Sequence, residues 1–248
     1  MRRATALRRE LPAAFRIPYR AHVSANVVRT DGGDYLQVFK LDGGSFETAD
    51  DEVLNNWHER LNVLWRGVAA PNVALWTHVV RRRDRARAPA AGPSERDFAE
   101  RLTARYGARL SSETLMVNEL YLAVVYRPVV GAAPNLLSRL LRTQAAHNLA
   151  AEQADALDAC EKLAQTLMSS LARYEPDRLG VHEANGRHYS RVLEFLSFLL
   201  NAEGVPVRLT TVPLHEALAT TRVIFGTETI EYRLPTDTRF GAILGIKE

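Results

Sequence analysis

The pattern of apolar and polar residues predicts three strands in the N-terminal half of the chain. Residues 35–41 alternate with a period near two, and the Asp-Gly-Gly turn at residues 42–44 closes them. Residues 73–80 and 115–126 form apolar runs typical of buried strands, and Pro128 ends the second run. We expect the run at residues 115–126 to be the longest strand of the chain.

One apolar stripe with a spacing of three and four residues predicts a helix after residue 48. Its members are Leu54, Trp57, Leu61, Leu64 and Val68. Thr48 and Asp51 have the spacing of a capping box, in which each side chain accepts a hydrogen bond from a backbone N–H, so we expect the helix to begin there. If the stripe faces the core, replacing Trp57 by alanine is expected to cost about 3 to 5 kcal/mol.

Three more helices are predicted further along the chain. Ser94 and Asp97 indicate the start of a helix with an apolar stripe. A long helix over residues 135–174 has an apolar seam, and residues 187–202 form a strongly apolar helix. The stripe consists of Phe98, Leu102 and Tyr106, and the seam consists of Leu157, Cys160, Ala164, Leu167 and Leu171. Short strands are predicted at residues 179–182, 207–211, 221–225 and 229–234.

Strands and helices therefore follow one another along the whole chain, which predicts an α+β (or α/β) fold with two-layer mixed sheets and packed helices. We divide the chain into an Arg-rich N-terminal arm at residues 1–18, a first α/β lobe at residues 19–130, and a long helix plus a second α/β lobe at residues 131–248. Residues 239–248 have the pattern of a strand that enters a further domain. We therefore expect the chain to be truncated before that domain.

The composition, 46% hydrophobic and 25% charged, is that of an ordinary globular protein. The net charge of +3 is too small to direct the whole molecule toward nucleic acid. The single cysteine, Cys160, excludes an internal disulfide framework and a zinc site with several cysteines, and it favours a reducing, cytoplasmic setting. The sequence contains neither a secretory signal pattern nor an apolar run of roughly 18 residues that would span a membrane.

The chain lacks the motifs of common catalytic sites. A phosphate-binding P-loop requires a Gly-Lys dipeptide, and the sequence contains none. His58, His182 and His215 each precede a glutamate, but none has a second histidine four residues on, so we expect no metal site. Cys160 lies on the apolar seam, which favours a buried packing role over nucleophilic catalysis. We assign no catalytic, cofactor-binding or metal-binding residue.

A cluster of arginines, Arg81, Arg82, Arg83, Arg85 and Arg87, is the main electrostatic feature. We place it in a loop between a strand and a helix. It is a candidate contact for anionic lipid headgroups or an acidic partner, and the alternative is a solvated loop without a partner. Aromatic residues do not alternate with these arginines, so direct binding of nucleic acid is not favoured.

Eight short blocks occur in order from about residue 18 to the end of the chain. They are residues 34–43, 46–50, 61–62, 71–78, 117–122, 126–128, 196–201 and 241–248. This ordered set resembles the N-terminal, non-catalytic region of the type IV secretion and conjugal-transfer transport ATPases, the CagE/TrbE/VirB family. In that family the segment similar to residues 241–248 leads to an ATPase domain.

The resemblance implies a docking or interaction domain of a motor that energises transport of protein or DNA across the bacterial envelope. It implies partners among the inner-membrane subunits of the secretion channel and neighbouring protomers, a place at the cytoplasmic face of the inner membrane, and hexamers of the full-length protein. Peripheral membrane contact is compatible with it. ATP and Mg²⁺ belong to the domain that this chain lacks, so we expect no enzyme activity of the chain itself. The alternatives are a stand-alone soluble enzyme and an anionic-surface binding module.

Overall fold

The computed structural model describes residues 13–84, 97–112, 115–128, 142–234 and 236–245. Most of the Arg-rich arm lies outside them, and its last part contains the short 3-10 helix η1 (Ala13–Arg16). None of the helices within the described ranges combines the length and the apolar character that crossing a bilayer requires.

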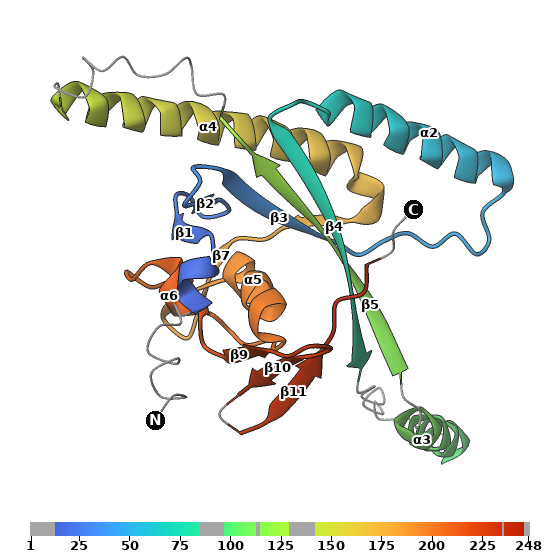
Figure 1. The fold of residues 1–248 in the computed structure, drawn as a ribbon. Helices are drawn as coiled ribbons and strands as arrows, with labels where there is room; N and C mark the ends of the chain where they lie inside the picture. The colour runs from blue at the N-terminus through green and yellow to red at the C-terminus, as the bar shows by residue number, and fades with distance from the viewer. Residues whose placement is uncertain (1–12, 85–96, 113–114, 129–141, 235, 246–248) are drawn as a thin grey trace, which may run out of the picture.

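A six-stranded antiparallel sheet forms the centre of the molecule (Figure 1). Along it lie β1 (Tyr19–His22), β2 (Val28–Thr30), β3 (Tyr35–Leu41), β5 (Leu115–Tyr126) and β4 (Val73–Asp84), and β6 (Pro176–Arg178) pairs with the end of β3. The named strands pair only in antiparallel fashion, so the predicted mixed sheet is wrong. The predicted strands at residues 35–41 and 115–126 are confirmed, and β4 is as long as β5.

Helices α2 (Asp51–Val68) and α4 (Arg142–Ser170) cover one face of this sheet (Figure 1). Phe39 and Leu122 point to this face and pack against Leu64 and Leu167, which are all at most 5% exposed. The predicted long helix is confirmed within the described residues, and the short 3-10 helix η3 (Ala172–Tyr174) follows it. The predicted seam of α4 faces the sheet, because apolar residues three and four apart share one side of a helix.

The opposite face carries α5 (Arg191–Asn201) and α6 (Leu214–Leu218). Val38 and Ala123 point to this face, because neighbouring residues of a strand face opposite sides, and they pack with Leu193 and Leu196. The predicted α+β class is confirmed. Helices lie on both faces of the sheet, however, rather than on the one face of a two-layer packing.

Two small antiparallel sheets complete the fold: β7 (Val181–Ala184) with β8 (Arg187–Ser190), and β9 (Arg222–Phe225) with β10 (Ile230–Arg233) and β11 (Thr238–Gly241). The β7–β8 turn is Asn185-Gly186, whose φ angles are +52° and +67°. Positive φ at both central residues is typical of the two-residue turns of hairpins. The sequence contains this hairpin signal, which our prediction missed.

The hairpin corrects the predicted helix at residues 187–202, because its first four residues form β8 and the helix begins at Arg191. The predicted strand at residues 207–211 is also wrong, since only Arg208 forms an isolated bridge, to Tyr189. Residues 187–190 are Arg-His-Tyr-Ser, so the apolar pattern of the helix begins only after Ser190. None of residues 207–211 is buried, and a short stretch of mixed apolar and polar residues does not by itself specify a strand.

The predicted capping box at Thr48 is wrong as well. Helix α2 begins at Asp51, and its N-cap residue Asp50 makes no side-chain cap bond. Leu64 and Val68 are buried as the stripe predicts, but Trp57 is half-buried. Figure 1 shows the first turns of α2 extending past the end of α4, where the Arg173 guanidinium carbon lies 3.2 Å from the centroid of the Trp57 ring.

Candidate interaction surface

Strands β4 and β5 continue beyond the sheet as a two-stranded projection, here called the hairpin extension. Strand β3 pairs only with the part of β5 from Leu120 onward, whereas β4 and β5 pair as far as Asp84 and Leu115. Residues 81–84 and 115–118 form the extension, and α3 (Asp97–Ser112) lies at its end (Figure 1). At about 3.3 Å per residue, the four residues of each strand carry α3 roughly 13 Å past the sheet.

The predicted arginine cluster is distributed over this region. Arg81, Arg82 and Arg83 lie in β4 rather than in a loop, which corrects the prediction, because β5 continues to supply backbone hydrogen-bond partners. Arg85 and Arg87 lie outside the described residues. Arg81 and Arg83 are exposed on the face of the strand opposite to Arg82. All three described members are thus exposed, and Arg82 differs from the other two because it faces the cleft described below.

Arg82 belongs to a charged cluster centred on Glu119, whose side chain is only 12% exposed. Its carboxylate pairs with Arg82 and with Lys40, whose Nζ lies 3.0 Å from Oε1. Tyr121 Oη donates to Oε2 at 3.1 Å. The three strands β3, β4 and β5 are thereby joined by one carboxylate at the base of the hairpin extension.

The same contacts set the protonation of the cluster. Burial alone would raise the pKa of Glu119, but the hydrogen bonds and charges of Lys40 and Arg82 outweigh it and hold that pKa below its ordinary value. Burial and the neighbouring carboxylate raise the pKa of Tyr121 to about 12. Glu119 is thus ionised and Tyr121 protonated at neutral pH. Neither group is tuned to exchange protons near pH 7, as general acid–base catalysis would require.

A cleft of about 380 Å³ lies beside this cluster, between the sheet and α5. Phe195 forms its apolar wall, with ring centroids 4.6 Å from Tyr121 and 5.3 Å from His78. The charged residues of its lining are Lys40, Arg82, Arg191, Glu119 and Glu194. Most of them already have a partner of opposite charge. Glu119 pairs with Lys40 and Arg82, and Arg191 pairs with Asp177, which is not part of the lining. The lining favours a structural ion-pair cluster over a built site for a small substrate.

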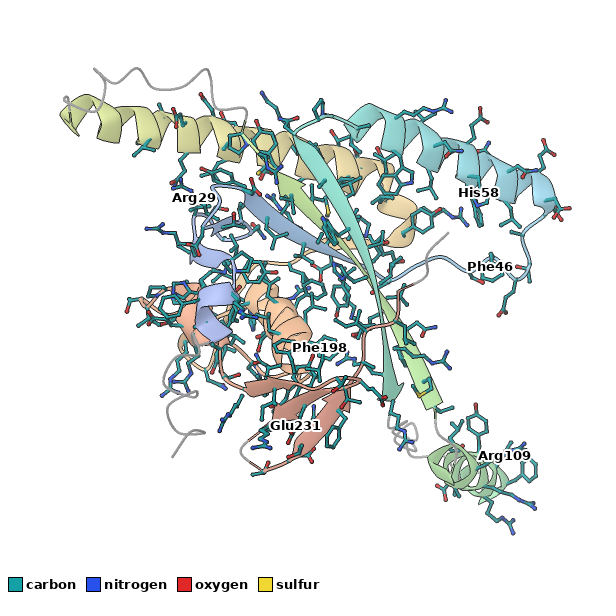
Figure 2. All side chains as sticks on the ribbon, in the orientation of Figure 1. Arg29, Phe46, His58, Arg109, Phe198 and Glu231 are labelled. Carbon is teal, nitrogen blue, oxygen red and sulfur yellow. The ribbon has the colours of Figure 1, made fainter. Side chains whose placement is uncertain are left out.

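Helix α3 presents its predicted apolar stripe to solvent. Phe98, Leu102 and Tyr106 are 73%, 59% and 57% exposed. Figure 2 shows the α3 side chains, with Arg109 labelled, well apart from Phe198 on α5. Contiguous exposed apolar side chains mark interaction sites on many proteins, so this helix is the strongest candidate for a contact with another molecule.

The remaining reactive groups are placed for packing. Cys160 is 1% exposed, and burial raises the pKa of its thiol to about 11, so it is protonated at neutral pH. This agrees with the predicted packing role. Within the described parts of the chain, no three His, Cys, Asp or Glu side chains gather as metal ligands would.

Sequence reasoning missed the Glu119 cluster and the exposure of α3. A weak signal existed for the first: Lys40 and Glu119 are charged residues inside predicted buried strands, where an unpaired charge is costly. Nothing in the spacing of Phe98, Leu102 and Tyr106 distinguishes a stripe that faces a core from one that faces solvent.

Comparison with protein families supports the resemblance noted in the sequence. Residues 26–133 match the family described as "Type IV secretion system ATPase VirB4/TrbE, N-terminal domain". Residues 177–248 match "CagE, TrbE, VirB family, component of type IV transporter system". The first match contains β3, β4 and β5 with the hairpin extension, and the second contains α5 and the small sheets.

The chain is also similar to individual proteins that are named as type IV secretion system proteins. The chain is 34% identical to the type IV secretion system protein PtlC homolog of Bordetella bronchiseptica, over 99% of this chain and 30% of the relative. It is 37% identical to virB4 of Brucella melitensis, over 94% of this chain and 28% of the relative. It is 32% identical to virB4 of Bartonella quintana, over 97% of this chain and 30% of the relative. The chain thus spans less than a third of the length of these relatives.

Proposed function

Because the chain belongs to the VirB4/TrbE family of type IV secretion system ATPases, we propose that it is a docking domain of such an ATPase. In this proposal the whole protein hydrolyses ATP, with Mg²⁺, in a part outside these 248 residues. The present chain holds that motor at the base of the channel, at the cytoplasmic face of the inner membrane. Its partners are the inner-membrane subunits and, in a hexamer, neighbouring protomers.

The observation that carries this proposal is the hairpin extension with α3 at its end. The extension adds little to the core, because its strands pair only with each other and the α3 stripe is mostly exposed. An element that contributes little to folding yet exposes Phe98, Leu102 and Tyr106 is best explained by a contact outside the domain.

The arginine cluster Arg81, Arg82, Arg83, Arg85 and Arg87 remains a proposed contact for an acidic partner or an anionic surface. Arg81 and Arg83 are its best candidates among the described residues, since both are exposed on the extension. Arg82 has less support in this role, because its guanidinium already pairs with Glu119.

The alternative of a stand-alone enzyme has less support. The cleft places an ionised Glu119 beside a protonated Tyr121, and their pKa shifts move both groups away from proton exchange at neutral pH.

Co-purification tests the docking role. The chain is produced together with the other subunits of its secretion system, the membranes are dissolved in a mild nonionic detergent, and the chain is captured by an affinity tag. We expect inner-membrane subunits to be retained, and retained less by the Arg81→Ser, Arg83→Ser variant. Capture of the chain without any of these subunits would contradict the proposal. So would ATP turnover by the purified chain that a mock preparation lacks.

The matched control is Arg60→Ser with Arg66→Ser on α2, which removes two exposed arginines from another surface. This variant should retain the subunits as the unchanged chain does. Equal losses for both variants would mean that retention depends on total charge and not on the hairpin extension.

A further inference from the structure

Strand β4 forms one edge of the central sheet. It pairs with β5 along its whole length, and among the described residues no other strand pairs with it. At about 3.4 Å per residue, its 12 residues give an edge about 40 Å long. One side of such an edge strand presents backbone N–H and C=O groups that have no partner within the sheet.

The odd-numbered residues of β4 carry these unpaired groups. The N–H of Arg127 donates to the carbonyl of Asn72 at 2.8 Å, one position before the pair of Val73 and Tyr126. Hydrogen-bonded and non-hydrogen-bonded pairs alternate in an antiparallel ladder, so the even-numbered residues of β4 bond to β5. Val73 agrees with this, because its N–H donates to the carbonyl of Ala70 instead. The backbone groups of residues 75, 77, 79, 81 and 83 therefore point away from β5.

The exposure of the side chains shows that this edge is open to solvent. Val73 and Leu75 pack with the core beneath α2 and α4, but Thr77 on the same face is exposed. Val79 follows it and is 68% exposed, and Trp76 on the opposite face is 60% exposed. A neighbouring strand would cover part of these side chains on both faces of the sheet.

One end of the edge is positively charged. Arg81 and Arg83 are exposed and lie on one face, about 7 Å apart along the strand. Neither side chain forms an ion pair or a hydrogen bond with a residue that the structure describes. The side chains of an added strand would lie directly opposite them, with about 4.5 to 5.5 Å between Cβ atoms. Two carboxylates at alternate positions of that strand would therefore pair with both arginines.

Charge on an edge strand also serves to prevent unwanted pairing between copies of a protein. In β4 the Lys, Arg, Asp and Glu residues all lie at positions 81–84, and the exposed Trp76, Thr77 and Val79 carry no charge. Positive charge at one end repels a basic strand and attracts an acidic one. The edge therefore discriminates between partners rather than excluding all of them.

We propose that the outer edge of β4 receives an extended acidic segment of a protein partner, which adds a strand to the central sheet. Backbone hydrogen bonds to the odd-numbered residues supply affinity, and carboxylates opposite Arg81 and Arg83 fix the register. The strand-binding edge follows from the contacts described above. The identity of the partner, a subunit of the secretion system, rests on the proposed function.

A synthetic strand tests the edge directly. The probe is a fluorescent peptide, Glu-Thr-Glu-Thr-Val-Thr-Val-Thr-Val, and its binding to the full 248-residue chain is measured by anisotropy. In antiparallel pairing, its glutamates lie opposite Arg83 and Arg81. Its valines then lie opposite Val79, Thr77 and Leu75. The reversed sequence provides the parallel orientation, and we expect one of the two peptides to bind.

N-methylation of the peptide distinguishes strand addition from simple charge attraction. A methyl group on the backbone nitrogen opposite Val79 removes a donor that faces β4, whereas the same group on the next residue faces solvent. We expect the first peptide to bind about tenfold more weakly and the second to bind as the unmodified peptide does. Equal affinity of all three peptides would overturn the proposal.

Charge reversal tests the register. Arg81→Glu with Arg83→Glu should weaken binding by about tenfold or more, because two cross-strand attractions become repulsions. A peptide with lysine in place of glutamate should restore binding to this variant. The matched control, Arg60→Glu with Arg66→Glu, reverses two exposed arginines on α2 and should bind the original peptide normally. Equal losses for both variants would assign the effect to total charge and contradict the proposal.

Hydrogen exchange reports the new backbone bonds without any substitution. The unpaired amides of residues 75–83 should exchange fast in the free chain and become protected when the peptide is present. The amides of α5, on the other side of the sheet, should keep their exchange rates. Peptide binding without protection in β4 would place the peptide elsewhere and overturn the proposal.

Val79→Pro separates this inference from the docking proposal. The Val79 N–H points away from β5, so proline removes no bond of the β4–β5 ladder but blocks an added strand. Circular dichroism should show an intact fold, and co-purification should retain fewer secretion subunits than the unchanged chain does. Full retention by this variant would overturn the edge assignment and leave docking intact. Capture of no subunit by the unchanged chain, with the peptide still bound, would contradict docking alone.

A second copy of the chain is the competing occupant of the edge. Self-association that Val79→Pro abolishes, in a chain that binds neither peptide, would assign the edge to pairing between copies and overturn the proposal. Sedimentation velocity over a range of chain concentrations measures it.

Discussion

Glu119 joins three strands through a single carboxylate that is largely shielded from water. Replacing it by glutamine removes the negative charge that Lys40 and Arg82 share and leaves two half-exposed cations side by side. We expect Glu119→Gln to lower the free energy of unfolding by about 1 to 3 kcal/mol, measured by urea denaturation at pH 7.

The control for this change is Asp34→Asn, which breaks the pair with Arg127 (Arg127 Nε to Asp34 Oδ1, 3.0 Å). The Arg127 side chain is 72% exposed and water screens the pair, so its loss should lower the free energy of unfolding less than Glu119→Gln does. Equal losses for both variants would show that the Glu119 cluster is no more important than a surface ion pair.

Gly180 has no room for a side chain because a neighbouring residue lies too close, and its φ angle is not the reason. A Cβ at this position would lie 2.3 Å from Nδ2 of Asn26, whose amide donates to the carbonyl of Leu179 at 3.0 Å. Gly180→Ala therefore displaces the amide and breaks its bond, and we expect a loss of about 2 to 3 kcal/mol in the free energy of unfolding.

A double-mutant cycle tests the stated cause. In the Asn26→Ala background the clash is gone, so Gly180→Ala should then cost little more than Asn26→Ala alone. A full additional loss in that background would mean that backbone conformation, and not the Asn26 side chain, requires glycine.

At the scale of elements, α5 depends on its N-cap residue, Ser190. Ser190 Oγ accepts from the backbone N–H of Leu193 at 3.2 Å, and it also lies 2.8 Å from Nε2 of His22 on β1. Ser190→Ala removes a cap and a link between two elements, with an expected loss of about 1 to 2 kcal/mol in thermal or urea unfolding.

Thr48→Ala provides the comparison, because α2 begins three residues later and has no side-chain cap. It should leave the unfolding midpoint unchanged, although the sequence pattern predicted a capping box at that residue. A similar loss for both variants would show that α2 does use Thr48 as its cap.

The sequence predicted best those elements whose apolar pattern matches their burial in the fold. β3 and β5 are bounded by a turn and a proline, and they are apolar because both of their faces are covered. The start of α5 was predicted wrongly because the Asn185-Gly186 turn was missed, and residues 187–190, which are Arg-His-Tyr-Ser, form β8 instead. Hydrophobic spacing reports burial, and it distinguishes helix from strand only over longer windows.

At the scale of the whole molecule, two partly buried histidines make stability depend on pH. Burial lowers the pKa of His22, against the opposing effect of backbone hydrogen bonds, and burial lowers that of His78. Below pH of about 6.5 the unfolded chain binds protons that the folded chain resists. Stability from both groups is thus complete above that pH and is lost as the pH falls.

Urea denaturation at a series of pH values from about 7.5 down to about 5.5 measures this effect. The free energy of unfolding should decline over that range, and His22→Gln with His78→Gln should flatten the decline. His58→Gln on the exposed side of α2 is the control and should keep it. A decline that the double variant leaves unchanged would assign it to other groups.

The sequence alone determined the α+β class, most of the strands and helices, the packing role of Cys160 and the family resemblance. These properties depend on local spacing or on residue identity, which are present in any single chain. The tertiary structure alone decided that helices cover both faces of the sheet, that Arg82 pairs with Glu119, and that the α3 stripe faces solvent. Each of these depends on which surfaces meet across long distances in sequence: Lys40 and Glu119 are 79 residues apart. Apolar spacing identifies the side of a helix that avoids water, but it does not say whether a core, a lipid surface or another protein covers that side.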